Sequence, residues 1–268
     1  MKQLALLCLA LISCGHTGGK LIQIRFRAGG TSRAAPGPLT FPAAQGWTVT
    51  LQTARIALGP FYFNVSPPLK DTLRSGLVII EATEQVIIDP LDPILRDVPG
   101  GADGQTENAV ACEIGLFPPD ATASAGDRQR LGGPNCTSPQ CTIFAYVAGT
   151  ATDGTKTVPF AGNIAVNPGQ VSQQSPLPYL QRVNGATVNL SFTAQTQAVE
   201  LRVDPRGWFN AADFSALVGV TPSQGNYWDA ANCARGGANF DVARCTFQTS
   251  LYSGVVQADG VYQFAVTP

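Results

Sequence analysis

Hydrophobic and polar residues alternate along most of this chain. From residue 21 to residue 27, Ile22, Ile24 and Phe26 fall on one face of an extended segment, and polar residues fall on the other. This period of two predicts half-buried β-strands. Alternation or short apolar runs predict further strands at 47–58, 77–80, 86–88, 109–117, 142–152, 156–166, 188–192, 199–203, 246–256 and 261–266.

Residues 47–58 change phase within one segment. The apolar positions run through Val49 and Leu51, and then through Ala54 and Ile56. Because neighbouring side chains of a strand point to opposite faces, this change predicts a β-bulge or bend near residues 52–53.

Turn residues separate the predicted strands. Asp153-Gly154 and Asp259-Gly260 each lie between two apolar segments, which is typical of a hairpin. About ten strands divided by Gly- and Pro-rich turns indicate an antiparallel sandwich or barrel. We predict an all-β fold, an antiparallel β-sandwich of Greek-key or jelly-roll type.

One short helix interrupts the strands, near residues 211–217. Asn210 is a suitable N-cap, Asp213 follows three residues later, and Phe214 and Leu217 give an apolar side. We expect Trp208 to pack under this helix. A second helical turn is predicted at 227–232, and loops at 97–108, 120–141 and 167–178.

The N-terminus has the layout of a secretory signal. Lys2 precedes an apolar run from residue 4 to residue 12, and a small residue precedes Cys14. Residues 11–14 resemble the bacterial lipobox, in which the cysteine is acylated and becomes the new N-terminus. We predict a signal peptide at 1–13, lipidated Cys14 with a tether at 14–19, and a single β-sandwich domain at 20–268. The alternative is an ordinary cleaved signal without acylation.

These features also predict where the protein resides and what it contacts. The apolar run is shorter than the ~20 residues that span a bilayer, so anchoring is favoured over spanning. Gly15 is not the acidic residue that often retains lipoproteins in the inner membrane, which favours an outer-membrane lipoprotein of the cell envelope. The membrane, through the N-terminal lipid anchor, is the predicted partner. A protein or glycan partner stays open.

Composition narrows the possible chemistry. The formal net charge is −1 and 13% of residues are charged, which argues against a nucleic-acid partner. His16 is the only histidine and lies in the tether, and Met1 is the only methionine. The folded part therefore lacks the imidazole that Ser-His-Asp and Cys-His catalysis, the usual zinc sites and type 1 copper sites require. No cofactor is predicted.

Five cysteines follow the tether, and an oxidising compartment favours disulfides among them. Cys233 and Cys245 bracket a Gly-rich loop and could form a local bridge. Cys136 could pair with Cys141, or Cys112 could pair with either of those two. Because five is an odd number, one thiol is left over or pairs outside the chain.

The acidic residues offer the remaining chemistry. Asp89, Asp92 and Asp97 are candidate calcium ligands, although their spacing is not that of an EF-hand and solvated loop acids are the simpler interpretation. Glu81 or Glu84 with Asp89 could form a glycosidase pair.

A second acidic group surrounds the predicted helix start. Asp204, Arg206 and Asp213 are interpreted as a structural cluster, in which the guanidinium bridges carboxylates.

Three segments carry a family resemblance. They are residues 46–63 with their Ala-Leu-Gly-Pro-Phe-Tyr-Phe ending, residues 149–160, and residues 201–214 with the run Leu-Arg-Val-Asp-Pro-Arg-Gly-Trp-Phe-Asn. They resemble uncharacterised myxobacterial-type secreted lipoproteins, which implies an envelope location and a β-rich fold. A looser similarity is to the small β-rich partner proteins of bacterial copper-uptake systems. Related proteins often carry histidines after the Gly-Pro-aromatic strand, where this chain has residues 64–68 without any, so a copper role is not carried over.

Together these observations predict a lipid-anchored envelope module that binds or supports another molecule without catalysis. The alternatives are a histidine-free, carboxylate-based enzyme acting on glycans, and a calcium-stabilised adhesion module.

Overall fold

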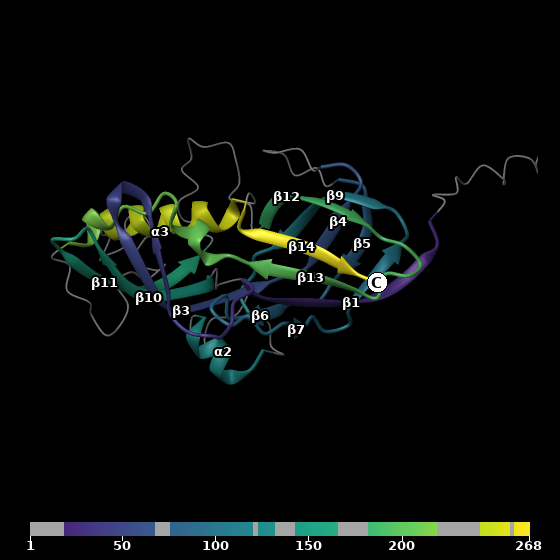
Figure 1. Cartoon of the computed structure of the whole chain (residues 1–268), viewed down its shortest axis with the longest axis horizontal. Helices are drawn as coiled ribbons and strands as arrows, with labels where there is room; N and C mark the ends of the chain where they lie inside the picture. Colours follow the sequence, from purple (N-terminus) through teal and green to yellow (C-terminus); the bar gives the residue numbers. More distant parts are fainter. Residues whose placement is uncertain are drawn as a thin grey trace, which may run out of the picture.

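The computed structural model describes residues 19–67, 76–119, 123–131, 143–165, 182–218, 242–257 and 260–268. Most of these residues lie in strands of two sheets that pack around a common hydrophobic core (Figure 1). The predicted all-β sandwich is confirmed.

The larger sheet has nine strands in the order β12-β9-β4-β5-β8-β1-β13-β14, with β7 also paired to β1. Neighbours are antiparallel except β1 and β13, which run parallel, a departure from the purely antiparallel prediction. The strands are β1 (Leu21–Gly30), β4 (Phe61–Asn64), β5 (Val78–Ala82), β7 (Arg96–Asp97), β8 (Ala102–Gln105), β9 (Asn108–Gly115), β12 (Arg182–Ser191), β13 (Ala198–Val203) and β14 (Tyr262–Thr267).

The smaller sheet has five strands in the order β11-β10-β3-β2, with β6 also paired to β3. They are β2 (Leu39–Pro42), β3 (Thr48–Leu58), β6 (Val86–Ile88), β10 (Ile143–Thr152) and β11 (Thr157–Ala165). β3 carries the predicted bulge: Ala148 and Gly149 of β10 face Thr53 and Leu51, so Gln52 has no partner. The apolar residues before and after the bulge are all buried in the core, which confirms the change of phase.

Gly59 and Pro60 carry the chain from β3 in one sheet to β4 in the other. The peptide bond between them is cis, and Gly59 has φ of 120°, a region that side chains with a Cβ rarely adopt. A Cβ at Gly59 would lie 2.5 Å from the carbonyl oxygen of Glu84. Only glycine fits this crossing between the sheets.

The helical segments are η1 (Ala44–Gly46), α2 (Ala125–Arg130), η3 (Pro205–Phe209), η4 (Phe214–Leu217) and α3 (Val242–Val256). The helix predicted at 211–217 is shorter, a 3-10 turn that starts after Asp213. Asp213 rather than Asn210 is the N-cap, and its carboxylate accepts a hydrogen bond from the Ser215 amide at 2.9 Å. Asp204 caps η3 in the same way.

The prediction of a strand at 246–256 is wrong, because this segment belongs to the 15-residue helix α3. Phe247, Leu251 and Val255 are spaced by four residues and are all buried, which places them on one side of a helix. Two predicted loops are also wrong in part: β7 and β8 fall within or beside 97–108, and α2 falls within 120–141. The predicted turn at 227–232 and loop at 167–178 lie outside the described residues.

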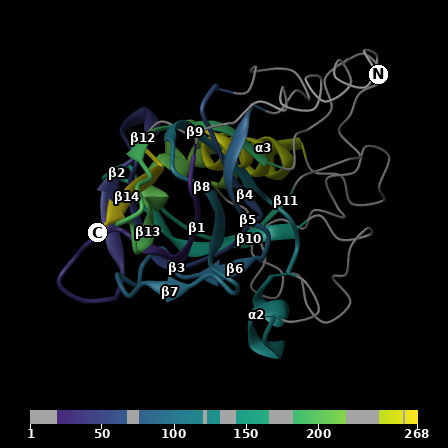
Figure 2. The same ribbon diagram turned by 90° about the vertical axis from the view of Figure 1, so that its right-hand side faces the viewer.

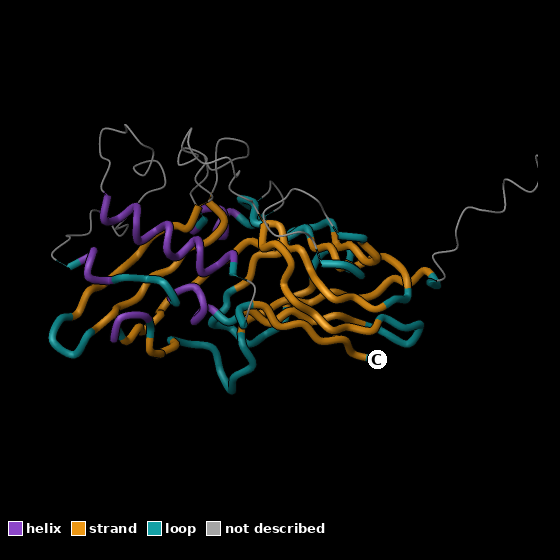
Figure 3. The backbone as a smooth tube through the Cα atoms, turned by 90° about the horizontal axis from the view of Figure 1, so that it is seen from above, coloured by secondary structure: helices purple, strands orange, loops and turns teal. Residues whose placement is uncertain are grey.

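The helices are not evenly distributed. In Figure 3 the helical segments, drawn in purple, gather at one end of the molecule, while the other end consists of strands and loops. Helix α3 contacts η3, η4 and strand β11 of the five-stranded sheet there. Helices α3 and α2 lie on opposite sides of the five-stranded sheet (Figures 1 and 2).

Two aromatic clusters follow from this arrangement. The strand cluster comprises Phe26, Phe61, Phe63, Phe192 and Phe264, contributed by the nine-stranded sheet and the residue after β12. The helix-covered cluster comprises Phe41, Trp47, Phe160, Phe209, Phe214 and Phe247, in which strands meet η3, η4 and α3.

Candidate functional site

Among the described residues, the two least exposed carboxylates, Glu113 and Asp204, each lie beside an arginine. Glu113 on β9 is 2% exposed, and its Oε1 lies 3.3 Å from Nη1 of Arg182 on β12. Burial raises the pKa of Glu113, and the charge of Arg182 opposes that rise. The pair links the edge strand β12 to its neighbour β9. The sequence does not predict the Glu113–Arg182 pair, because only the pairing of β9 with β12 brings the two residues together.

The predicted cluster around the helix start is confirmed in part. Arg206 Nε lies 2.9 Å from both carboxylate oxygens of Asp204, and the Arg206 amide also donates to Asp204 Oδ1 at 3.0 Å. This contact raises the pKa of Arg206 through the hydrogen bonds and charge of Asp204. Asp213 instead caps η4 by itself. These acids fix the chain between β13 and η4.

The candidate calcium ligands are placed in a tightly bonded loop. Asp89 forms an ion pair with Arg55 of β3 and accepts a hydrogen bond from the Leu91 amide at 2.9 Å. Asp92 Oδ1 accepts from the Ile94 amide at 2.9 Å, and Asp97 is an exposed residue of β7. In the part of the chain that the structure describes, no three His, Cys, Asp or Glu side chains are grouped to hold a metal ion.

The same loop is fastened to the sheets through its backbone. The Gly30 amide donates to the carbonyl of Asp92 at 2.9 Å, and the Arg202 guanidinium donates to the carbonyl of Pro93. Aspartates that close successive turns are common where a loop must hold one conformation. The contacts of Asp89 and Asp92 therefore hold this loop in one conformation.

The acids proposed for glycan hydrolysis lie on different elements. Glu81 is exposed on β5 of the nine-stranded sheet, Glu84 is exposed in the turn that follows, and Asp89 comes after β6 of the other sheet. The residue directly opposite Glu81 is Asp103 on β8, which is also exposed. Like charges that face each other across two strands repel. Glu81 and Asp103 form a short acidic strip on the outer face of the sheet, which is known only from the strand register.

Of the five cysteines that follow the tether, the structure describes the side chain of Cys112. Cys112 on β9 is fully buried and is a free thiol, so its suggested pairing with Cys136 or Cys141 is corrected. Burial raises the pKa of the Cys112 thiol well above its usual value. The side chains of Cys136, Cys141, Cys233 and Cys245 lie outside the described residues, and so does Cys14.

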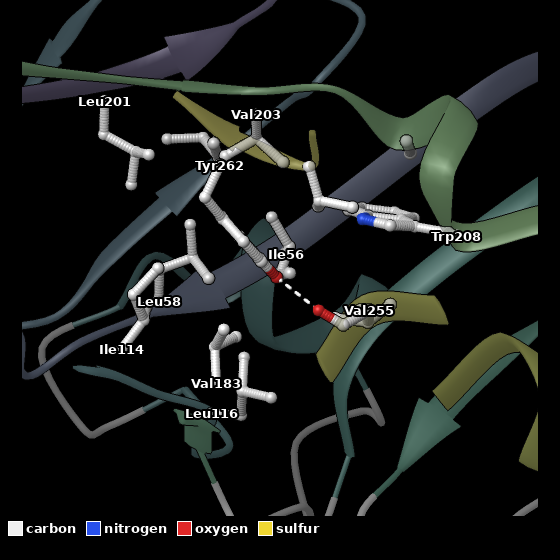
Figure 4. Close-up of a cluster of buried hydrophobic side chains, with 14 of the residues drawn as sticks. Ile56, Leu58, Ile114, Leu116, Val183, Leu201, Val203, Trp208, Val255 and Tyr262 are labelled. Carbon is white, nitrogen blue, oxygen red and sulfur yellow. Dashed lines mark hydrogen bonds between the residues drawn. The ribbon is translucent and has the colours of Figure 1, made fainter. Parts of the chain in front are cut away.

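The aromatic residues near η3 belong to the core. Both Trp47 and Trp208 are buried. Figure 4 shows Trp208 with Tyr262 and Val255, and the Tyr262 hydroxyl donates to the carbonyl of Val255 at 2.9 Å. Burial raises the pKa of Tyr262. The indole nitrogen of Trp208 is buried without a hydrogen-bond partner in the described structure.

No protein-family model and no curated protein matches this chain. Among solved structures, MbnP from Methylosinus trichosporium is similar at 10% sequence identity and a TM-score of 0.35. The match covers 93% of this chain and 99% of the other. None of the helices in the described ranges has the length and apolar character needed to cross a bilayer.

Proposed function

We propose that the protein is a lipid-anchored lipoprotein of the cell envelope, in which a β-sandwich body binds or supports another molecule without catalysis. The observation that carries this proposal is the order of the N-terminal segments. A signal-like leader and a lipobox-like Cys14 come five residues before Gly19, where the described structure begins, and β1 starts two residues later. The leader therefore leads directly into a strand-built body.

The arrangement of the acids supports a non-catalytic role. Glu113, Asp204, Asp89 and Glu200 each make an ion pair with an arginine. A carboxylate that is held by an arginine within the fold is engaged in a structural contact, and this does not call for a role in proton transfer. The resemblance of three segments to secreted lipoproteins is part of the same proposal.

The experiment expresses the full chain in a bacterium that processes lipoproteins and combines intact-mass analysis with membrane fractionation. We expect a mature chain that starts at Cys14, carries acyl groups including palmitate, and sediments with the outer membrane. The matched control is Cys14→Ser, which keeps the leader but removes the acyl acceptor, and it should lose both the added mass and the membrane association. A wild-type mature chain without acyl groups would contradict the proposal.

A further inference from the structure

One end of the nine-stranded sheet carries a group of exposed apolar side chains. Leu21 is 77% exposed, Leu77 59%, Val78 37% and Val110 40%. These are four of the seven large apolar residues that are exposed in the described structure. Single exposed apolar residues are ordinary, but a group of them at one end marks an interaction surface.

The strand register places these four residues together. Leu21 of β1 faces Gln105 at the end of β8, and the Lys20 amide donates to Thr106 Oγ1 at 2.8 Å just beyond it. The next strand across is β5, which begins with Val78.

The same end continues through β4 to β9. Asn64 of β4 faces both Val78 of β5 and Ala111 of β9, next to Val110. Because neighbouring strands are about 4.8 Å apart, the span from Leu21 to Val110 over β8, β5 and β4 is about 20 Å. We call Leu21, Leu77, Val78 and Val110 the apolar end.

The chain enters the fold at this end. β1 begins at Leu21, at the right of Figure 1, and Cys14 is seven residues earlier. Seven residues reach at most about 25 Å when fully extended. An acyl anchor on Cys14 would therefore hold Leu21 close to the headgroups of the bilayer.

The opposite end of the sheet provides the contrast. Ile94 is 63% exposed. Its backbone lies beside Gly29, as shown by the 2.7 Å that would separate a Cβ at Gly29 from the Ile94 carbonyl oxygen. At about 3.3 Å per residue, Gly29 is about 26 Å from Leu21 along β1. A short tether thus favours contact of the apolar end, and not of Ile94, with the membrane.

We propose that the apolar end is a membrane-docking surface, which rests on the phospholipid bilayer that holds the acyl chains of Cys14. This inference rests on the proposed lipid anchor and adds an orientation to it. Burial of these side chains among headgroups and upper acyl chains contributes hydrophobic free energy to docking. Because the anchor keeps the protein at a high local concentration beside the bilayer, a small apolar patch is sufficient for docking.

The test uses the full acylated protein in phosphatidylcholine vesicles that contain brominated phospholipid, which quenches nearby tryptophan. Leu77→Trp reports on the apolar end and Ile94→Trp on the opposite end, and the two positions are almost equally exposed. We expect the emission added by Leu77→Trp to be lost in brominated vesicles and that added by Ile94→Trp to persist. Val110→Trp is a second reporter on another strand and should behave like Leu77→Trp.

Flotation of the vesicles separates the two proposals. If the protein floats with the vesicles but neither Leu77→Trp nor Val110→Trp is quenched, the docking surface is wrong and the anchor stands. Equal quenching at Ile94 would also overturn the docking surface. If the wild-type protein does not float, the anchor fails, and the docking surface fails with it.

Discussion

The strand cluster and the helix-covered cluster both bury aromatic rings, but different kinds of element surround the rings in each. In the first, Phe63 contacts Phe26, Phe192 and Phe264 with ring centroids 5.4–6.0 Å apart, using strands and the residue after β12. In the second, Phe214 of η4 lies among Trp47, Phe160, Phe209 and Phe247, with centroids 5.0–6.2 Å apart. The nine-stranded sheet packs aromatic rings from several of its own strands together, whereas the rings on the five-stranded sheet pack against helical segments.

The two clusters nevertheless belong to one continuous core. We therefore predict that Phe63→Ala and Phe214→Ala, both of which empty fully buried sites, each lower the free energy of unfolding by about 3–5 kcal/mol. Urea unfolding followed by far-ultraviolet circular dichroism and by intrinsic fluorescence should give coincident transitions in both variants.

A different outcome would separate the clusters. If Phe214→Ala removed helical signal at low urea while amide hydrogen exchange in β1 and β4 stayed slow, the helix-covered end would be an independent unfolding unit. The single continuous core would then not unfold cooperatively.

The contact between α3 and η3 gives the next prediction. In an exposed helix, Gly→Ala stabilises by about 1 kcal/mol because alanine has the higher helix propensity. At Gly254 the new Cβ would lie 2.3 Å from the carbonyl oxygen of Trp208, so backbone must move apart. We expect Gly254→Ala to destabilise by about 1–3 kcal/mol, the usual cost of overpacking.

Ser253→Ala on the same helix is the matched control, since Ser253 is half-buried and its alanine variant adds no atoms. Thermal unfolding of both variants checks the sign of the effect. A more stable Gly254→Ala variant would show that α3 does not pack against η3 as closely as the structure indicates.

The difference between the clusters also explains what could be predicted from the sequence. Strands β1, β3, β10, β11 and β13 follow from alternation, and the bulge of β3 follows from its change of phase. The segment that forms α3 includes Thr-Phe-Gln-Thr-Ser-Leu-Tyr, which is rich in residues that favour strands, and this composition masks the helical spacing of Phe247, Leu251 and Val255. Tertiary packing on η3 and η4 outweighs that local preference.

Site residues were less predictable than strands. The Asp204–Arg206 contact is local, two residues apart, and so could be inferred. The Glu113–Arg182 pair and the Glu81–Asp103 opposition depend on strand partners that are remote in sequence. Pairing order within a sheet is set by the whole fold, and a single segment does not contain it.

Cys112 tests whether the nine-stranded sheet opens under native conditions. Its thiol is fully buried and its pKa is raised by that burial, so it should not react with iodoacetamide in the folded protein. We expect alkylation of Cys112, read by peptide mass spectrometry, only after denaturant unfolds the chain. Cys112→Ala identifies the peptide signal, and rapid alkylation of Cys112 without denaturant would show that β9 opens locally.

The smallest effect is expected at the exposed turn between β10 and β11. Asp153 Oδ1 accepts hydrogen bonds from the Thr155 and Lys156 amides at 2.8 and 2.7 Å and from the Thr155 hydroxyl at 2.8 Å. These bonds favour the carboxylate and lower the pKa of Asp153 from 3.8 to about 2. Because the folded pKa lies below the unfolded one, ionised Asp153 stabilises the fold above about pH 4, and this contribution is lost as the pH falls toward 2.

Asp153→Asn keeps an oxygen acceptor but not the charge, so it should be less stable than the wild type at pH 7 and equally stable near pH 2. Thermal melting of both proteins across this range measures the gap, and a gap that did not change with pH would mean that the charge of Asp153 contributes nothing to the turn.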